Sequence, residues 1–187
     1  NLILTGANTF TGLTTVSSGS LVVGANGTSG ALESDNVSLT GNIAFARSDD
    51  IIFSGNISGT GSLGKSASGN LTLTGTNTYS GDTLIATGRL IVGNGGTSGS
   101  VTNSNITNNA SLEFNRSDAI VYSKVISGTG NVTQAGTGTT NLTGANSYAG
   151  TTTISGGTLS VSGSLSDSSA VSVASGATYD VAASDTV

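Results

Sequence analysis

An eight-residue segment of this 187-residue chain recurs twice at one constant interval. The copies are Thr5–Gly12, Thr74–Gly81 and Thr143–Gly150, each with asparagine at its fourth position and an aromatic residue at its sixth. Arg47-Ser-Asp49 recurs at the same interval as Arg116-Ser-Asp118. Self-similarity at a fixed period is the signature of repeat architectures, in which each unit packs against its neighbours. We therefore read the chain as one repeat segment, 1–187, with units at approximately 1–69, 70–138 and 139–187, the last one truncated.

Within a unit, apolar and polar residues alternate over short stretches bounded by Gly, Asn and Ser. Leu71 and Leu73 alternate with threonines, and Leu112 and Phe114 flank Glu113. This period of two predicts short, half-buried strands, and no segment shows the apolar spacing of a helix. The class is therefore all-β.

A 69-residue unit divides into three pieces of ~23 residues, the size of one coil of a parallel β-helix. We expect a β-solenoid of about eight coils, three coils per unit, forming a rod roughly 40 Å long at ~4.8 Å per coil. Two residues are lost in the third unit, where Ala177 matches Ala110 at a spacing of 67. Such losses collect in solenoid turns. A propeller is less well matched because its blades run to ~40–50 residues, whereas a β-sandwich would refute the solenoid.

The stretch from Gly59 through Lys65 to Gly75, followed by Asn77, Tyr79 and Gly81, resembles the passenger-associated repeat of bacterial autotransporters. A second match runs from Gly128 to Val161, with Gln134 in place of the lysine, and a truncated copy starts at Asn1. The resemblance implies a right-handed parallel β-helix in a passenger that a C-terminal outer-membrane barrel exports to the cell surface, where passengers often act as adhesins. The chain would then be a fragment of a larger protein.

Composition narrows the chemistry. The chain has no cysteine or histidine, five basic and ten acidic residues, and a net charge of -5. Thiolate and imidazole sites are excluded, and the acidic balance argues against nucleic acid as a partner. No apolar run reaches the ~18–20 residues of a membrane-spanning helix. The expected partners are surface glycans or proteins, or further copies of the chain.

Gly59-x-x-x-x-Gly64-Lys65-Ser66 matches the phosphate-binding P-loop pattern letter by letter. A P-loop needs a helix immediately after it, and here a strand pattern follows. Because Gln134 replaces the lysine one unit later, we interpret the match as turn glycines. An adjacent serine and lysine on a strand or turn also have poor geometry for a nucleophile and base.

Asp49 and Asp50 are candidates for the carboxylate pair of a glycosidase, but adjacent strand residues face opposite sides. Asp50 becomes Ala119 in the next unit, whereas Asp49 recurs as Asp118 and Asp185. We expect the recurring Arg–Asp pair to form a polar turn, with the guanidinium meeting a carboxylate or a carbonyl. The glycine pairs lack the aspartate of calcium-binding nonapeptides.

Phe10, Tyr79 and Tyr148 occupy one repeat position. We expect each ring to cover a turn or to cap a hydrophobic stack, with the tyrosine hydroxyls reaching solvent. A sugar-stacking ladder spaced by three coils is the alternative.

These observations predict no catalytic, cofactor-binding or metal-ligating residue, and no cofactor. We favour a structural or adhesive stalk, not an enzyme, at the bacterial cell surface. A polysaccharide-binding or polysaccharide-cleaving β-helix, including one in a phage fibre, is the alternative. A threonine-ladder ice or surface binder ranks last because Thr-x-Thr does not recur in every coil.

Overall fold

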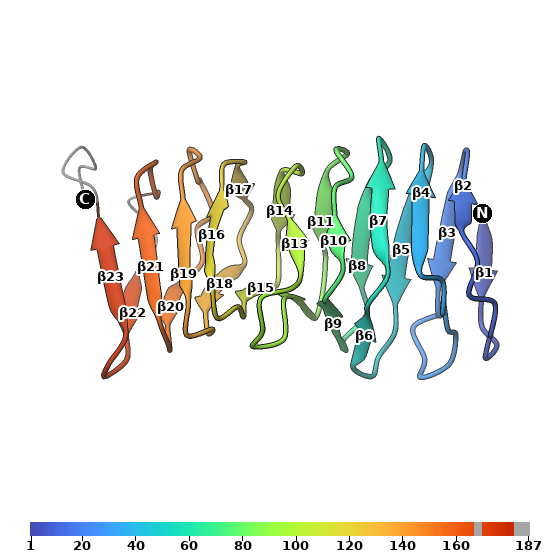
Figure 1. The fold of residues 1–187 in the computed structure, drawn as a ribbon, viewed down its shortest axis with the longest axis horizontal. Helices are drawn as coiled ribbons and strands as arrows, with labels where there is room; N and C mark the ends of the chain where they lie inside the picture. The colour runs from blue at the N-terminus through green and yellow to red at the C-terminus, as the bar shows by residue number, and fades with distance from the viewer. Residues whose placement is uncertain (167–169, 182–187) are drawn as a thin grey trace.

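The computed structural model describes residues 1–166 and 170–181, and its described part contains strands but no helix. The described residues wind into a rod of about nine coils, with β1 near one end and β23 near the other (Figure 1). At ~4.8 Å per coil the rod is about 43 Å long. All strand pairs are parallel, as a solenoid requires.

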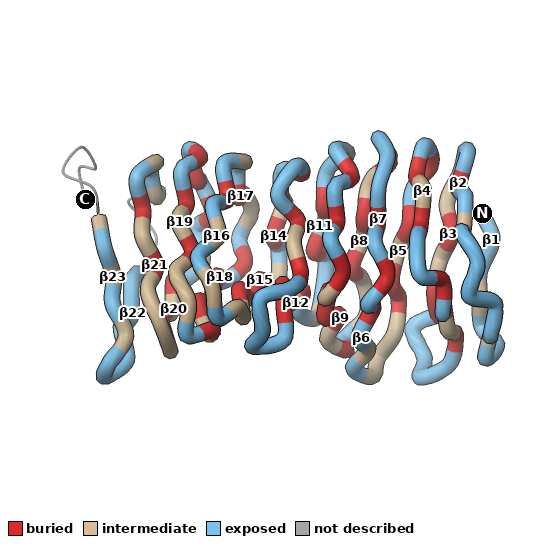
Figure 2. The backbone as a smooth tube through the Cα atoms, viewed as in Figure 1, coloured by how far each residue is buried: buried red, intermediate tan, exposed pale blue. Residues whose placement is uncertain are grey.

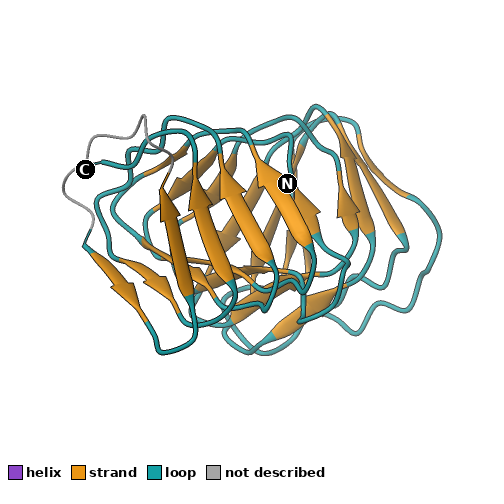
Figure 3. Cartoon of the chain, turned by 60° about the vertical axis from the view of Figure 1, so that its left-hand side comes forward, coloured by secondary structure: helices purple, strands orange, loops and turns teal. Residues whose placement is uncertain are grey.

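Three faces run along the rod, and turning the view by 60° shows their strands as separate layers (Figure 3). The first face is a seven-stranded sheet composed, in order, of β1 (Leu2–Leu4), β3 (Ser20–Val23), β5 (Asn42–Ala46), β8 (Leu63–Ser66), β11 (Thr83–Ile85), β14 (Ile106–Asn108) and β17 (Ile126–Ser127). The second face is another seven-stranded sheet, composed of β6 (Ile51–Phe53), β9 (Asn70–Leu73), β12 (Arg89–Val92), β15 (Ser111–Phe114), β18 (Asn131–Gln134), β20 (Thr152–Ile154) and β22 (Val171–Val173).

The third face is divided into three short sheets, which lie in one row at the front of Figure 1. They are composed of β2 (Thr14–Val16), β4 (Asn36–Leu39) and β7 (Asn56–Gly59); of β10 (Thr76–Asn77) and β13 (Ser100–Val101); and of β16 (Ala119–Tyr122), β19 (Thr139–Leu142), β21 (Thr158–Val161) and β23 (Thr178–Val181).

Alternation along each strand builds the core. Inward residues of successive coils stack in columns, such as Leu21, Ile43 and Leu63 on the first face. Leu71 and Leu90 form the equivalent column on the second face, and both are fully buried. Figure 2 shows these buried positions recurring in coil after coil. The predicted period-two pattern is therefore confirmed as the source of a narrow, continuous apolar core.

The parallel β-solenoid is confirmed, but the prediction of three coils per 69-residue unit is wrong. One inward column of the first face passes through Leu21, Ile43, Leu63, Thr83, Ile106 and Ile126. Its mean step is shorter than a third of a unit, so one unit covers about three and a third coils. Leu21 lies in β3 on the first face, whereas Leu90, its mate in the second unit, lies in β12 on the second face.

The advance of about three and a third coils per unit has a physical explanation. Each face presents the same environment to a strand, namely apolar on the inside and hydrogen-bonded to a coil on either side, so a unit can begin on any face. Successive units consequently start one face further around the rod. Equivalent residues of successive units wind around the rod and do not form a column along one side.

Candidate functional site

Lys65, the lysine of the P-loop-like pattern, is directed into the rod. Its side chain is only 2% exposed, and its Nζ donates hydrogen bonds of 2.8 Å to the carbonyls of Ser66 and Ala67. Burial lowers the pKa of this ammonium, with the charge of Asp50 opposing that shift. A Cβ built on Gly88 of the next coil would lie 2.8 Å from Nζ, so no space for a phosphate lies there.

Gln134, the residue one unit later, makes the same kind of contact. Its Nε2 donates to the carbonyl oxygens of Gly136 at 2.8 Å and Gly138 at 3.3 Å. Lysine and glutamine are thus interchangeable as long donors that satisfy turn carbonyls from inside the core. The structure agrees with the turn interpretation, and Lys65 is a structural residue.

The two predicted Arg–Asp pairs form, and each holds a protruding loop. Arg47 donates from Nε to Asp49 Oδ1 at 2.7 Å and from Nη2 to Oδ2 at 2.6 Å, while Nη1 donates to the carbonyl of Gly30. Arg116 makes the same fork with Asp118. It also donates to carbonyls of the loop that begins at Gly93.

These pairs hold the loops 24–30 and 93–99 against the rod. The hydrogen bond from Arg47 lowers the pKa of the exposed Asp49 carboxyl, and Arg116 lowers the pKa of Asp118 in the same way. Both alternatives expected for the guanidinium, a carboxylate and a carbonyl, therefore occur together. Asp185 lies outside the described residues.

Asp49 and Asp50 bond different partners, Asp49 the guanidinium of Arg47 and Asp50 the next coil. The carboxylate of Asp50 accepts two hydrogen bonds of 2.9 Å from Asn70, one from the backbone N–H and one from Nδ2. Asp50 therefore links one coil to the next. Among residues 1–166 and 170–181, no group of three or more acidic side chains is arranged to hold a metal ion.

The two tyrosines at the aromatic repeat position are more buried than the sequence predicted. Tyr79 and Tyr148 are buried, and their hydroxyls bond the Oγ1 atoms of Thr83 at 2.6 Å and Thr152 at 2.7 Å. Burial raises the pKa of Tyr79 to about 12. The expectation of hydroxyls in solvent is wrong because each finds a threonine four residues along the chain.

An aromatic sugar-stacking ladder is also excluded for this position. Thr83 lies in β11 on the first face and Thr152 in β20 on the second, so the two tyrosines approach different faces. Phe10 is 45% exposed, and Thr14 Oγ1, its matching hydroxyl, is buried with no partner among the described residues. The spacing aromatic-x-x-x-Thr was the sequence signal that would have revealed the pairing.

Two buried asparagines of the repeat were not predicted as a site, and both are structural. The Oδ1 of Asn77 accepts the N–H of Ile57 at 2.9 Å, and its Nδ2 donates to the carbonyl of Gly75. Asn146 accepts the N–H of Ile126 at 3.0 Å in the same way. These two asparagines thus join one coil to the next, whereas Lys65 and Gln134 bond carbonyls of their own turns.

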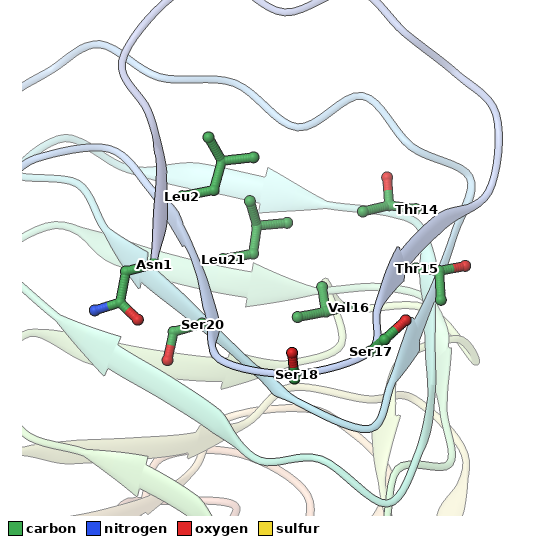
Figure 4. Close-up of a pocket in the computed structure, with 9 residues that line it drawn as sticks. All are labelled: Asn1, Leu2, Thr14, Thr15, Val16, Ser17, Ser18, Ser20 and Leu21. Atoms are coloured by element: carbon green, nitrogen blue, oxygen red, sulfur yellow. The ribbon is translucent and has the colours of Figure 1, made fainter.

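A hollow of about 420 Å³ lies at the N-terminal end of the rod, and Figure 4 shows the residues that line it. Leu2, Leu21 and Val16 point into it, with serine and threonine hydroxyls around them. These are inward residues of β1, β2 and β3, so the hollow is the end of the core beside β1.

No helix in the described residues is long and apolar enough to cross a membrane.

Comparison with known proteins identifies the repeat. A family model described as the passenger-associated-transport-repeat matches residues 1–23, 65–92 and 132–161. In these three segments the chain is similar to the passenger-associated-transport-repeat. The second and third matches contain the internal donors Lys65 and Gln134 and the buried aromatics Tyr79 and Tyr148, so this repeat encodes the coil contacts described above.

The Adhesin BmaC autotransporter of Brucella suis biovar 1 (strain 1330) is 40% identical to this repeat segment over 153 residues. The alignment covers 71% of this chain and 4% of that protein, so the chain spans only a small part of this relative's length. No solved structure matches the chain.

Proposed function

We propose that this chain is a stalk segment of an exported bacterial surface passenger, which supports folding of the passenger during export and contributes to adhesion. The observation that carries the proposal is the stack of parallel coils, in which the repeat residues Asn77 and Asn146 each bond the preceding coil. The similarity to an autotransporter adhesin supports a position at the cell surface. A C-terminal outer-membrane barrel in the parent protein is part of the same proposal.

Vectorial folding suits this construction. Each coil is hydrogen-bonded only to the coils adjacent to it along the chain, so a coil can join the stack as soon as it emerges. The Oδ1 of Asn131, for example, accepts the N–H of Thr151 one coil later at 2.9 Å. Stability accumulates along the rod without any contact between distant parts of the sequence.

The test uses the parent protein and two neighbouring residues of β12. Leu90 is fully buried and Ile91 points outward, so Leu90→Asp places a charge in the core while Ile91→Asp leaves the charge hydrated. We expect Leu90→Asp to reduce surface display, measured by antibody binding to whole cells, and adhesion with it. Display and adhesion that match those of Ile91→Asp would contradict the stalk role.

Cleavage of acidic polysaccharide is the less favoured alternative, and the fate of the basic residues argues against it. Arg47 and Arg116 are held by aspartates, Arg89 by Glu113 at 2.7 Å, and Lys65 is buried in a turn. Four of the five basic groups are therefore committed to internal contacts. Incubation of the purified chain with pectate or alginate should release no new reducing ends, and turnover would establish the enzyme instead.

A further inference from the structure

One strand of the second face has a free edge. The sheet begins at β6, although the preceding coil passes the same place as the irregular segment 30–34. At either end of this stretch the coils are joined, because the N–H of Ser48 bonds the carbonyl of Gly27 at 3.0 Å and that of Asn56 bonds Asp35 at 2.9 Å. Between these two bonds no described residue pairs with β6 on that side.

The backbone of β6 presents hydrogen-bonding groups to this opening. The carbonyl of Phe53 accepts the N–H of Thr74 on the following coil, so Phe53 is directed toward β9. Because backbone groups alternate between the two neighbours along a parallel strand, those of Ile52 point the other way. No described residue is hydrogen-bonded to the N–H or C=O of Ile52 on this side, so both groups are available at the opening.

A cleft of about 240 Å³ lies between segment 30–34 and β6. Phe45 and Phe53 line it, with ring centroids 5.4 Å apart, and Val23 and Leu32 add further apolar surface. A smaller hollow continues it past Ile52 to Ser54 and Gly55. The opening is thus apolar inside and has backbone donors and acceptors along one wall.

The charge at the cleft is negative. Glu33 lines it, whereas the single cation of the lining, Arg47, is paired with Asp49. No described residue forms an ion pair with Glu33. A second copy of this chain, with its net charge of -5, would be repelled here.

We propose that this cleft binds an extended, basic segment of a partner protein, which adds to the free edge of β6 as an additional strand. Main-chain hydrogen bonds to Ile52 supply affinity, as in other cases of strand addition. An aliphatic side chain of the guest faces Phe45 and Phe53, and a lysine or arginine beside it faces Glu33. The site does not depend on the stalk role, because it needs only the folded rod.

The chain contains its own control for this proposal. β16 is the mate of β6 one unit later and also begins a sheet, with Val121, 58% exposed, at the position of Ile52. There Thr102 replaces Glu33 and Ala119 replaces Asp50. The two edges share a backbone arrangement, but only the β6 edge has an acidic residue, Glu33, in the lining of its cleft to select a basic guest.

The experiment measures binding of a fluorescein-labelled peptide, Lys-Val-Lys-Val-Lys-Val-Lys, to the 187-residue chain by fluorescence anisotropy. Ile52→Pro removes the N–H that faces the cleft but no native hydrogen bond, so an edge strand accepts it. We expect Ile52→Pro to weaken binding about tenfold and Val121→Pro to leave it within about twofold. A peptide N-methylated at alternate residues should bind the wild-type chain as weakly as the unmodified peptide binds Ile52→Pro.

The outcomes separate the alternatives. Absence of binding at millimolar peptide, or binding insensitive to both Ile52→Pro and N-methylation, overturns strand addition. Greater sensitivity to Val121→Pro overturns the assignment to β6, and sedimentation showing dimers that Ile52→Pro dissociates assigns the edge to a second copy. Should Ile52→Pro lower the melting temperature, Glu33→Lys and protection of the Ile52 amide from hydrogen exchange test the same site, and no change in either refutes it.

Discussion

The hydroxyl chain around Tyr79 offers a quantitative test of how one repeat position stabilises the rod. Tyr79 Oη and Thr83 Oγ1 are 2.6 Å apart, and Thr83 Oγ1 and Ser104 Oγ on the next coil are 2.7 Å apart. Tyr79→Phe deletes one hydrogen bond and leaves Thr83 bonded to Ser104, so we expect a loss of about 1 kcal/mol. Thr83→Val removes the partner of two buried hydroxyls and should cost about 2 kcal/mol.

The assay is a double-mutant cycle on urea unfolding midpoints, combined with hydrogen exchange of the amides near Thr83. In the Tyr79→Phe background, Thr83→Val should cost about 1 kcal/mol less than in the wild type, because no tyrosine hydroxyl is then left without a partner. Equal costs in both backgrounds would refute the reasoning. The pair Tyr148 and Thr152, at 2.7 Å on another face, provides an independent repetition in which Tyr148→Phe should again be destabilising.

Three further predictions follow from the same contacts. Lys65→Gln, which introduces the residue of the next unit, should keep the urea midpoint nearly unchanged, whereas Lys65→Met should lower stability by about 1–3 kcal/mol; equal midpoints would show that the turn carbonyls need no internal donor. Gly61→Ala drives a Cβ into the backbone carbonyl of Gly41 on the previous coil and should prevent correct stacking, detected as lost strand circular dichroism, while Gly6→Ala meets nothing within 4 Å and should fold normally. Arg116 lowers the folded-state pKa of Asp118 below 3.8, so its contribution is present above pH 3.8 and is lost as the pH falls through the depressed value. Asp118→Asn should therefore flatten the acid dependence of the melting temperature below that pH, and an unchanged acid slope would contradict the role of the pair.

The strand pattern was predictable because alternation is a local property. Leu71 and Leu73 lie inward and Thr72 outward in β9, as the period of two requires. The Arg47–Asp49 pair was also predictable, since its members are two residues apart. Each of these features depends only on neighbours along the chain.

The coil length was not predictable, since it depends on how many residues each turn absorbs. The steps from Leu63 to Thr83 and from Thr83 to Ile106 differ by three residues with no change in the strands they connect. A division of the unit into three equal coils ignores this freedom. The free edge of β6 was unpredictable for the same reason. It exists only because segment 30–34 of the preceding coil does not pair with β6.

Whether the unit advances by three coils or by three and a third tests the account most directly. The chain has no cysteine, so pairs of spin labels can be placed at will, and Val22, Leu84 and Ile91 all point outward. Val22 and Leu84 share a column three coils apart, which gives about 14 Å between backbones. Val22 and Ile91 are equivalent residues of successive units on different faces, and an axial rise of ~16 Å combined with a similar lateral offset gives about 23 Å. Spin-label line broadening and double electron–electron resonance should therefore find the Val22→Cys/Leu84→Cys pair closer than the Val22→Cys/Ile91→Cys pair, and the reverse order would contradict the winding of the repeat around the rod.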